Sequence, residues 1–100
     1  MKTRVCRVDE LDDGEMVRVE IEPPIAVYNV EGEFFATSDV CTHMVSSLTE
    51  DGYLDGCVVE CGWHMAKFDV KTGALLMPPG TEPLKTYVVE VSDDEIFVEH

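Results

Sequence analysis

The sequence predicts an all-β protein built from stacked antiparallel sheets, and three observations lead to this fold class. Short runs rich in Val, Ile, Phe and Tyr are bounded by Gly, Pro, Asp and Asn. No long stretch repeats its apolar residues with the period of an α-helix. The runs follow one another at the short spacing that is typical of antiparallel sandwiches and barrels.

The strands are expected where these β-prone runs occur. In chain order, the predicted strands are Thr3–Val8, Met16–Ile21, Ile25–Tyr28, Glu33–Thr37, Val58–Glu60, Lys67–Asp69, Ala74–Leu76, Lys85–Val91 and Glu95–Val98.

Turn residues punctuate these strands. Glu31-Gly32 and Thr72-Gly73 each stand between two strand-like runs and predict hairpin turns. The acidic run Asp93-Asp94-Glu95 is expected at a third hairpin tip. Pro23-Pro24 and Pro78-Pro79-Gly80 cannot continue a central strand, so they mark loops.

The chain is expected to form a single domain over residues 1–100. It is short, and it has no internal repeat and no linker. A chain this short buries only about two-thirds of its unfolded surface, so a metal centre would help to hold its loops. No apolar run approaches the ~20 residues needed to cross a bilayer, and Met1-Lys2-Thr3-Arg4 leads into charged residues. We therefore expect a cytoplasmic protein without a membrane partner.

The charge balance is strongly acidic. The chain has 21 Asp and Glu against 7 Lys and Arg, a formal net charge of −14. This excludes nucleic-acid binding, which needs a basic surface. The acidic surface has two equally weighted interpretations, namely solubility and steering toward basic patches on a partner.

Two short pieces carry most of the functional information. They are Cys41-Thr42-His43 and Cys61-Gly62-Trp63-His64, with 17 residues between His43 and Cys61. Each piece pairs one sulfur ligand with one nitrogen ligand. Two Cys and two His form the ligand set of a Rieske [2Fe–2S] centre, in which the Cys hold one iron and the His hold the other. The pattern predicts one such cluster per chain, held by Cys41, His43, Cys61 and His64.

Other interpretations of these residues remain open at this point. Structural zinc also accepts two Cys and two His, although zinc modules usually pair like with like. A Cys–His nucleophilic dyad would leave the other pair unexplained. The last alternative is two unrelated core Cys and two surface His, and it must treat the mirrored spacing of the two pieces as an accident.

The other two cysteines, Cys6 and Cys57, lie in strand-like apolar runs. The four cysteines do not follow the spacing of a plant-type ferredoxin. Cys6 and Cys57 are expected to be small buried hydrophobic residues. Because Cys57 is near Cys61 in sequence, a disulfide between them in the metal-free protein is a further possibility, one that a cytoplasmic location disfavours.

Residues 38–83 resemble the Rieske-type ferredoxins, the electron carriers of bacterial multicomponent aromatic-ring dioxygenases. The shared features are CTH, Leu48 five residues after His43, TEDGYLDG, VEC-x-x-H and FD-x-KTG. The resemblance implies stacked sheets with a small cluster-binding subdomain at one tip, about residues 39–72. It also implies that the two ligand pieces are facing loops, with a third wall at residues 77–80.

The resemblance further implies a one-electron carrier that catalyses no reaction of its own. It would accept electrons from a flavin-containing ferredoxin reductase, deliver them to a terminal oxygenase, and act as a monomer. The small Rieske subunit of a nitrite reductase-like enzyme and a zinc-stabilised interaction module are the alternatives. High-potential Rieske proteins have hydroxyl groups where this chain has Ala66 and Phe68, so a low reduction potential is expected.

The chain departs from the family pattern at several positions. Gly62 stands where the family usually has Pro, and Met65 where it usually has Gly. Either Met65 has an ordinary φ or Gly62 supplies the backbone freedom. The respiratory Rieske proteins carry two bridging Cys where this chain has Ser46 and Trp63, so that disulfide cannot form.

Overall fold

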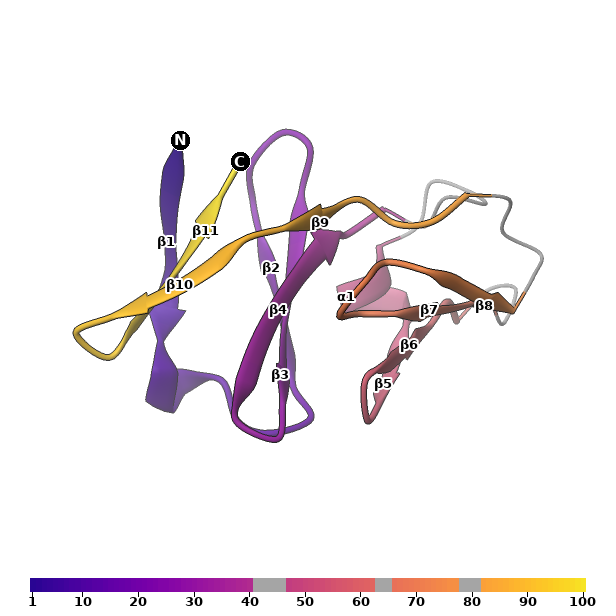
Figure 1. The fold of residues 1–100 in the computed structure, drawn as a ribbon, viewed down its shortest axis with the longest axis horizontal. Coiled ribbons are helices and arrows are strands. Elements are labelled where there is room, and N and C mark those ends of the chain that lie inside the picture. The colour runs from indigo at the N-terminus through magenta and orange to yellow at the C-terminus, as the bar shows by residue number, and fades with distance from the viewer. Residues whose placement is uncertain (41–46, 63–65, 78–81) are drawn as a thin grey trace.

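The computed structural model describes residues 1–40, 47–62, 66–77 and 82–100. Within these residues the strands form three antiparallel sheets (Figure 1). The first sheet has the order β1 (Lys2–Arg7), β11 (Glu95–Glu99) and β10 (Val89–Ser92). The second has the order β2 (Met16–Val19), β3 (Ile25–Val30), β4 (Glu33–Ser38) and β9 (Thr86–Tyr87). The third has the order β5 (Tyr53–Asp55), β6 (Val58–Glu60), β7 (Lys67–Asp69) and β8 (Leu75–Met77). The predicted all-β class is confirmed.

The middle sheet organises the core because β3 is buried along its whole length. Alternate residues of a strand point to opposite faces, so β3 serves two hydrophobic clusters. Ala26 and Tyr28 pack with Val59 and Phe68 of the third sheet. Ile25 and Val27 pack instead with residues of the first sheet, among them Ile96 and Val98. The middle sheet therefore links the third sheet to the first.

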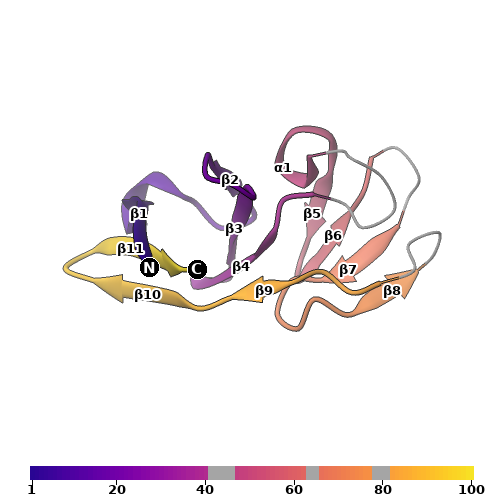
Figure 2. The ribbon, with the colours of Figure 1, turned by 90° about the horizontal axis from the view of Figure 1, so that it is seen from above.

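The predicted strand Lys85–Val91 is in fact two strands. β9 pairs with β4 through Ala36 and Tyr87, whereas β10 pairs with β11. Val88 lies between them, and its carbonyl accepts a hydrogen bond of 2.9 Å from the amide of Glu99. The chain thus changes sheets at Val88, and Figure 2 shows this segment running along one side of the molecule from the second sheet to the first.

The predicted hairpin turns are present. Glu31 and Gly32 have φ values of 53° and 87°, and Asp93 and Asp94 have values of 52° and 63°. Two consecutive positive φ values are the signature of the tight hairpin turn that matches the twist of antiparallel strands. Gly73, in the third predicted turn, has a φ of 78°.

Two elements near the predicted ligands have no counterpart in the sequence-based assignment. They are the helix α1 (Leu48–Asp51) and strand β5 (Tyr53–Asp55). A helix of one turn shows no periodicity, and a three-residue strand has too little β-prone composition to stand out. The helix α1 depends on contacts with Asp39, as described below, whereas β5 pairs with the neighbouring strand β6.

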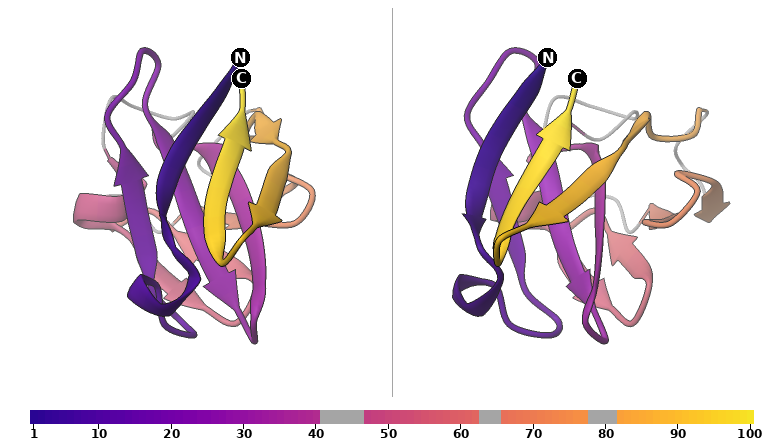
Figure 3. Two further views of the ribbon diagram at one scale, coloured as in Figure 1. Left: turned by 90° about the vertical axis from the view of Figure 1, so that its left-hand side faces the viewer. Right: turned by 60° about the vertical axis from the view of Figure 1, so that its left-hand side comes forward.

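The two termini lie side by side in the first sheet (Figure 3). The Met1 amino group donates to the His100 carbonyl and the His100 amide donates to the Met1 carbonyl, each at 2.8 Å. No helix in the described residues is long and apolar enough to span a membrane.

Candidate metal centre

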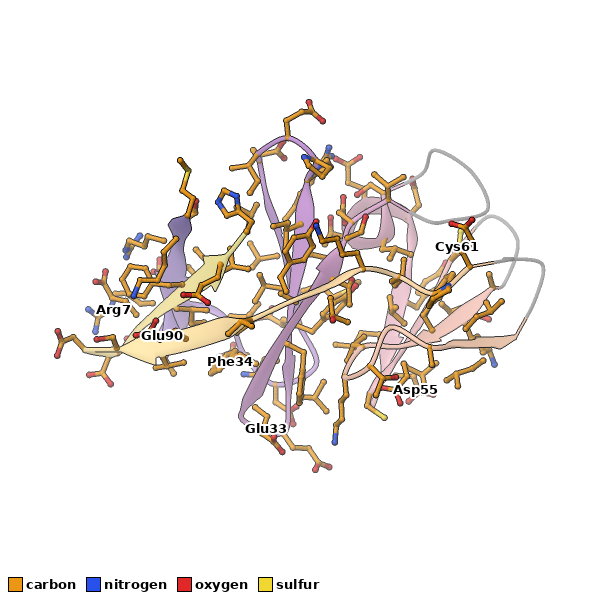
Figure 4. All side chains as sticks on the ribbon, turned by 45° about the horizontal axis from the view of Figure 1, so that its top comes forward. Arg7, Glu33, Phe34, Asp55, Cys61 and Glu90 are labelled. Atoms are coloured by element: carbon orange, nitrogen blue, oxygen red, sulfur yellow. The ribbon has the colours of Figure 1, made fainter. Side chains whose placement is uncertain are left out.

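Of the four predicted ligands, Cys61 lies in the described part of the structure. It directly follows β6 and is 1% exposed. In Figure 4, Cys61 lies at the opposite end of the molecule from Arg7 and Glu90. Cys41, His43 and His64 lie outside the described residues, so their roles as ligands stay a prediction.

The segment that carries His64 is closed at its base. The amide of Cys61 donates a hydrogen bond of 2.7 Å to the carbonyl of Ala66. Residues 61 and 66 therefore hold both ends of the four intervening residues. A closed base of this kind suits a ligand-bearing segment, because it brings the two ends of the segment together.

Cys61 packs with apolar side chains of the described residues. Cys61 belongs to the same buried cluster as Leu48, Ala66 and Phe68, which are at most 1% exposed. Such a shell would keep water away from a bond between the Cys61 thiolate and a metal. It would also lower the local dielectric constant, which affects the reduction potential of the metal. A soft sulfur donor in a dry site fits an iron–sulfur cluster.

The segment that carries Cys41 and His43 also has a closed base. Val40 and Ser47 form an isolated antiparallel bridge across it. The amide of Leu48 donates a hydrogen bond of 2.7 Å to the carbonyl of Asp39. The chain thus leaves the end of β4 and returns to it, with two predicted ligands in between.

The helix α1 brings the bases of the two segments together. A β-carbon built on Gly62 would lie 1.8 Å from the carbonyl oxygen of Asp51, which is far inside any allowed contact. A β-carbon on Gly52 would lie 2.5 Å from the Leu48 oxygen and 2.7 Å from the Glu60 oxygen. Backbone therefore packs directly on backbone at this junction, and only glycine permits it.

The sequence left open whether Gly62 supplies unusual backbone freedom to its loop. The structure shows that it does not. Its φ is not among the positive values of the chain. Glycine is needed at position 62 for the close approach to Asp51 and not for unusual backbone freedom. Met65 lies outside the described residues.

Asp39 is a second feature that the sequence did not single out. Its carboxylate is fully buried, and its two oxygens accept from the Ser47 hydroxyl at 2.5 Å and the Thr49 amide at 2.9 Å. The Nε of Arg18 lies 3.4 Å from Asp39 Oδ2, without the geometry of a hydrogen bond. Arg18 Nη1 also donates to Glu50 at 2.7 Å. The only signal in the sequence is the capping pattern of Ser47 followed three residues later by Glu50.

The disulfide between Cys57 and Cys61, which the sequence analysis disfavoured, does not form in this structure. The two cysteines flank β6, so their α-carbons are about 13 Å apart at the rise of a strand. A disulfide requires less than about 7 Å. Cys6 and Cys57 are half-buried and pack against the edges of the two apolar clusters.

The described residues by themselves contain no group of three His, Cys, Asp or Glu that is able to hold a metal ion. The donor set predicted from the two motifs is two thiolates and two imidazoles. Its described member is buried, and the bases of both motifs meet at α1. The residues therefore fit a cluster that takes ligands from both segments.

Comparison with known proteins agrees with this site. Residues 1–88 match the model of the Rieske [2Fe-2S] domain. The chain is 49% identical to the biphenyl dioxygenase ferredoxin subunit of Pseudomonas sp. (strain KKS102), over 97% of the chain and 90% of that protein. It is 48% identical to the biphenyl 2,3-dioxygenase ferredoxin component of Rhodococcus jostii (strain RHA1), over 97% of the chain and 91% of that protein.

Solved structures give the same result. The Sphingomonas yanoikuyae B1 ferredoxin superposes with a TM-score of 0.92 at 43% identity, covering 100% of this chain and 99% of that one. A chain from a complex of reduced oxygenase and oxidised ferredoxin in carbazole 1,9a-dioxygenase superposes with a TM-score of 0.93 at 41% identity, covering 97% and 91%. The chain therefore belongs to the Rieske [2Fe–2S] domain family and is an electron-transfer ferredoxin with one [2Fe–2S] cluster, not a catalytic oxygenase.

Proposed function

We propose that Cys41, His43, Cys61 and His64 hold the cluster, and that the chain carries single electrons from a flavin-containing reductase to the terminal oxygenase of an aromatic-ring dioxygenase system. The observation that carries the ligand assignment is the buried Cys61 at the closed base of one motif, in contact through Gly62 and Asp51 with the helix that closes the other.

The cluster, when bound, supplies one-electron chemistry at a potential raised by imidazole ligands in place of thiolates. The described residues shape the environment of the cluster. Leu48, Ala66 and Phe68 keep water from the Cys61 sulfur. The hydrogen bond between Cys61 and Ala66 joins the two ends of the segment that carries His64 in sequence, and Cys61 lies at this end of the molecule (Figure 4).

The partners are inferred from the relatives. Relatives at 44–49% identity are named as ferredoxin components of biphenyl and p-cumate dioxygenase systems. A ferredoxin at 41% identity occurs in a complex with the carbazole dioxygenase oxygenase. A carrier with these relatives needs a separate electron donor, and a reduced flavin is a suitable class. We expect it to act as a monomer in the cytoplasm.

The acidic surface near the ligand segments indicates that the partners carry basic residues. Glu50, in α1, has a side chain that is 63% exposed, and the next residue, Asp51, is also exposed. Both adjoin the base of the second motif. A partner with basic residues around its own redox centre would be attracted to this end.

The test is direct electron transfer. The purified protein should be brown and contain two irons and two sulfides per chain. Mixed anaerobically with an oxidised dioxygenase oxygenase, the reduced protein should be reoxidised in step with reduction of the oxygenase. A colourless protein with one zinc would refute the cluster. A protein with a cluster that no aromatic-ring oxygenase can reoxidise would refute the proposed role.

A further inference from the structure

We propose that Asp39 is a positioning residue of the metal centre, which fixes α1 and thereby the spacing between the two ligand-bearing segments. This inference rests on the ligand assignment proposed above. It is carried by the contacts of Asp39, of α1 and of Gly62, all of which lie in the described part of the chain.

The backbone of Asp39 is fixed on both sides. Its amide donates to the Pro24 carbonyl at 3.0 Å, and its carbonyl accepts from the Leu48 amide at 2.7 Å. The side chain is fully buried. Burying a carboxylate is costly unless its oxygens are paired, so the contacts that pair it are strongly held.

The two hydrogen bonds of the carboxylate lead to the first turn of α1, and the Arg18 guanidinium of β2 lies 3.4 Å from it. Ser47 donates to one carboxylate oxygen and the Thr49 amide donates to the other. The same Ser47 hydroxyl accepts from the Glu50 amide at 3.2 Å and so caps the helix. A helix of four residues is not stable by itself. The place of α1 is therefore set by Asp39, with the Arg18–Glu50 ion pair as a second attachment.

The other end of α1 meets the second motif. The Asp51 carbonyl fills the space beside Gly62, and the Gly52 backbone fits between Leu48 and Glu60. Gly62 follows Cys61 directly. Close backbone contacts leave little slack, so a displacement of α1 is transmitted to Cys61 and Gly62.

A carboxylate is the side chain that suits this role. One group has to accept from two different donors in the same turn, and a charged acceptor makes the stronger bonds. Asn in this place has a single acceptor oxygen and loses one of the two bonds. Because Asp39 is two residues before Cys41, the same carboxylate holds both ends of the first ligand segment.

The experiment compares three variants of the cluster-loaded protein. Asp39→Asn leaves one acceptor oxygen for the two donors and removes a charge. Ser47→Ala removes the hydroxyl that donates to Asp39 and caps α1, and it keeps the charge of Asp39, which separates positioning from a simple electrostatic effect. The matched control is Asn29→Ala. Asn29 is a buried polar residue that donates to the Leu11 carbonyl at 2.8 Å and accepts from the Gly32 amide at 2.9 Å, away from the ligand segments.

Three quantities are measured for each variant: the rate of iron release to a chelator, the paramagnetic resonance spectrum of the reduced protein, and the urea midpoint. Outer-shell substitutions at metal sites typically cost 10–100-fold in affinity. We expect Asp39→Asn and Ser47→Ala to release iron about 10-fold faster and to shift the g-values. Asn29→Ala should lower the urea midpoint with unchanged g-values and little change in iron release.

The proposal is overturned if Ser47→Ala and Asp39→Asn lose no more iron, and shift the spectrum no more, than Asn29→Ala at a comparable loss of stability. If Asp39→Asn does not fold, Ser47→Ala decides alone. A parent protein without a Rieske-type spectrum would instead refute the proposed function, so the two failures are distinguishable.

Discussion

The carbonyl oxygen of Asp51 occupies the space that a β-carbon at position 62 would need, at 1.8 Å from the ideal β-carbon position of Gly62. Asp51 lies between the two Cys/His motifs in sequence and Gly62 lies in the second motif, yet their backbones are in contact. The spacing of the two ligand segments depends on this contact.

The first prediction is that Gly62→Ala damages the metal centre. The added methyl group forces α1 away from the second motif, and overpacking of this kind costs about 1–3 kcal/mol. We expect the purified variant to hold less than half of the iron of the parent, measured per chain. Gly32→Ala is the control, because Gly32 has a φ of 87° with open space around it. That variant should lose about 1–2 kcal/mol of stability to backbone strain and keep its iron. Full iron content in Gly62→Ala would contradict the prediction.

The second prediction concerns the ligands. Replacing His43 or His64 by Ala should remove an iron ligand and abolish the Rieske-type paramagnetic signal of the reduced protein. Cys6→Ser and Cys57→Ser are the matched controls, since both residues only pack against the edges of the core. These controls should assemble the cluster with some loss of stability. A normal spectrum in either His variant would show that this His is not a ligand.

The third prediction concerns alkaline pH. Burial raises the pKa of the Tyr28 phenol well above its ordinary value of 10, although its hydrogen bond of 2.7 Å to Thr37 acts in the opposite direction. The folded protein therefore keeps a proton that the unfolded chain releases. The contribution to stability is complete below pH 10 and is lost as the pH rises above it.

Tyr28→Phe tests whether the buried phenol causes this loss of stability at alkaline pH. The variant should be about 1 kcal/mol less stable at neutral pH, because it loses one hydrogen bond. Its free energy of unfolding should fall less steeply than that of the parent above pH 10, measured by urea unfolding followed by circular dichroism. Parallel curves for the two proteins would disprove the buried phenol as the cause.

The fourth prediction concerns encounter with the oxygenase. Raising the ionic strength from about 0.01 to 0.15 M shortens the Debye length from about 30 to 8 Å, so the second-order rate of electron transfer should fall. Asp51→Asn should lower the rate at low salt, because Asp51 is exposed in α1 beside the ligand segments. Asp94→Asn makes the same charge change at the hairpin tip between β10 and β11, at the other end of the molecule (Figure 1), and should have a smaller effect. Equal effects of the two substitutions would argue against docking at the cluster end.

The fifth prediction concerns the reduction potential. Hydrogen bonds to the cluster sulfurs raise the potential, and Ala66 and Phe68 have no hydroxyl to donate. We expect a midpoint of about −150 mV, at the low end of the Rieske range. Ala66→Ser should raise it, since Ala66 is buried in the same cluster of side chains as Cys61. Ala36→Ser adds a hydroxyl in the other apolar cluster and should leave the potential unchanged. A parent midpoint well above zero would overturn the low-potential assignment.

Local chemistry explains what was predictable. The hairpin at Glu31-Gly32 depends on two residues that accept positive φ, and these residues are adjacent in the chain. The strand β3 is a run of apolar and β-branched residues whose composition alone marks it. The Cys and His motifs are local too, since each supplies two ligands within four residues. The sequence by itself therefore determined the all-β class, most of the strands and the kind of metal centre.

The tertiary structure decided how the two motifs are brought together. The helix α1 exists because Asp39, at the end of another strand, pairs with Ser47 and Thr49. The requirement for glycine at position 62 comes from the Asp51 carbonyl, and not from the φ of Gly62 itself. The predicted strand 85–91 divides at Val88 because its two halves pair with different sheets. Each of these features depends on contacts between different elements that meet only in the fold, and the capping pattern of Ser47 and Glu50 is the one local signal for any of them.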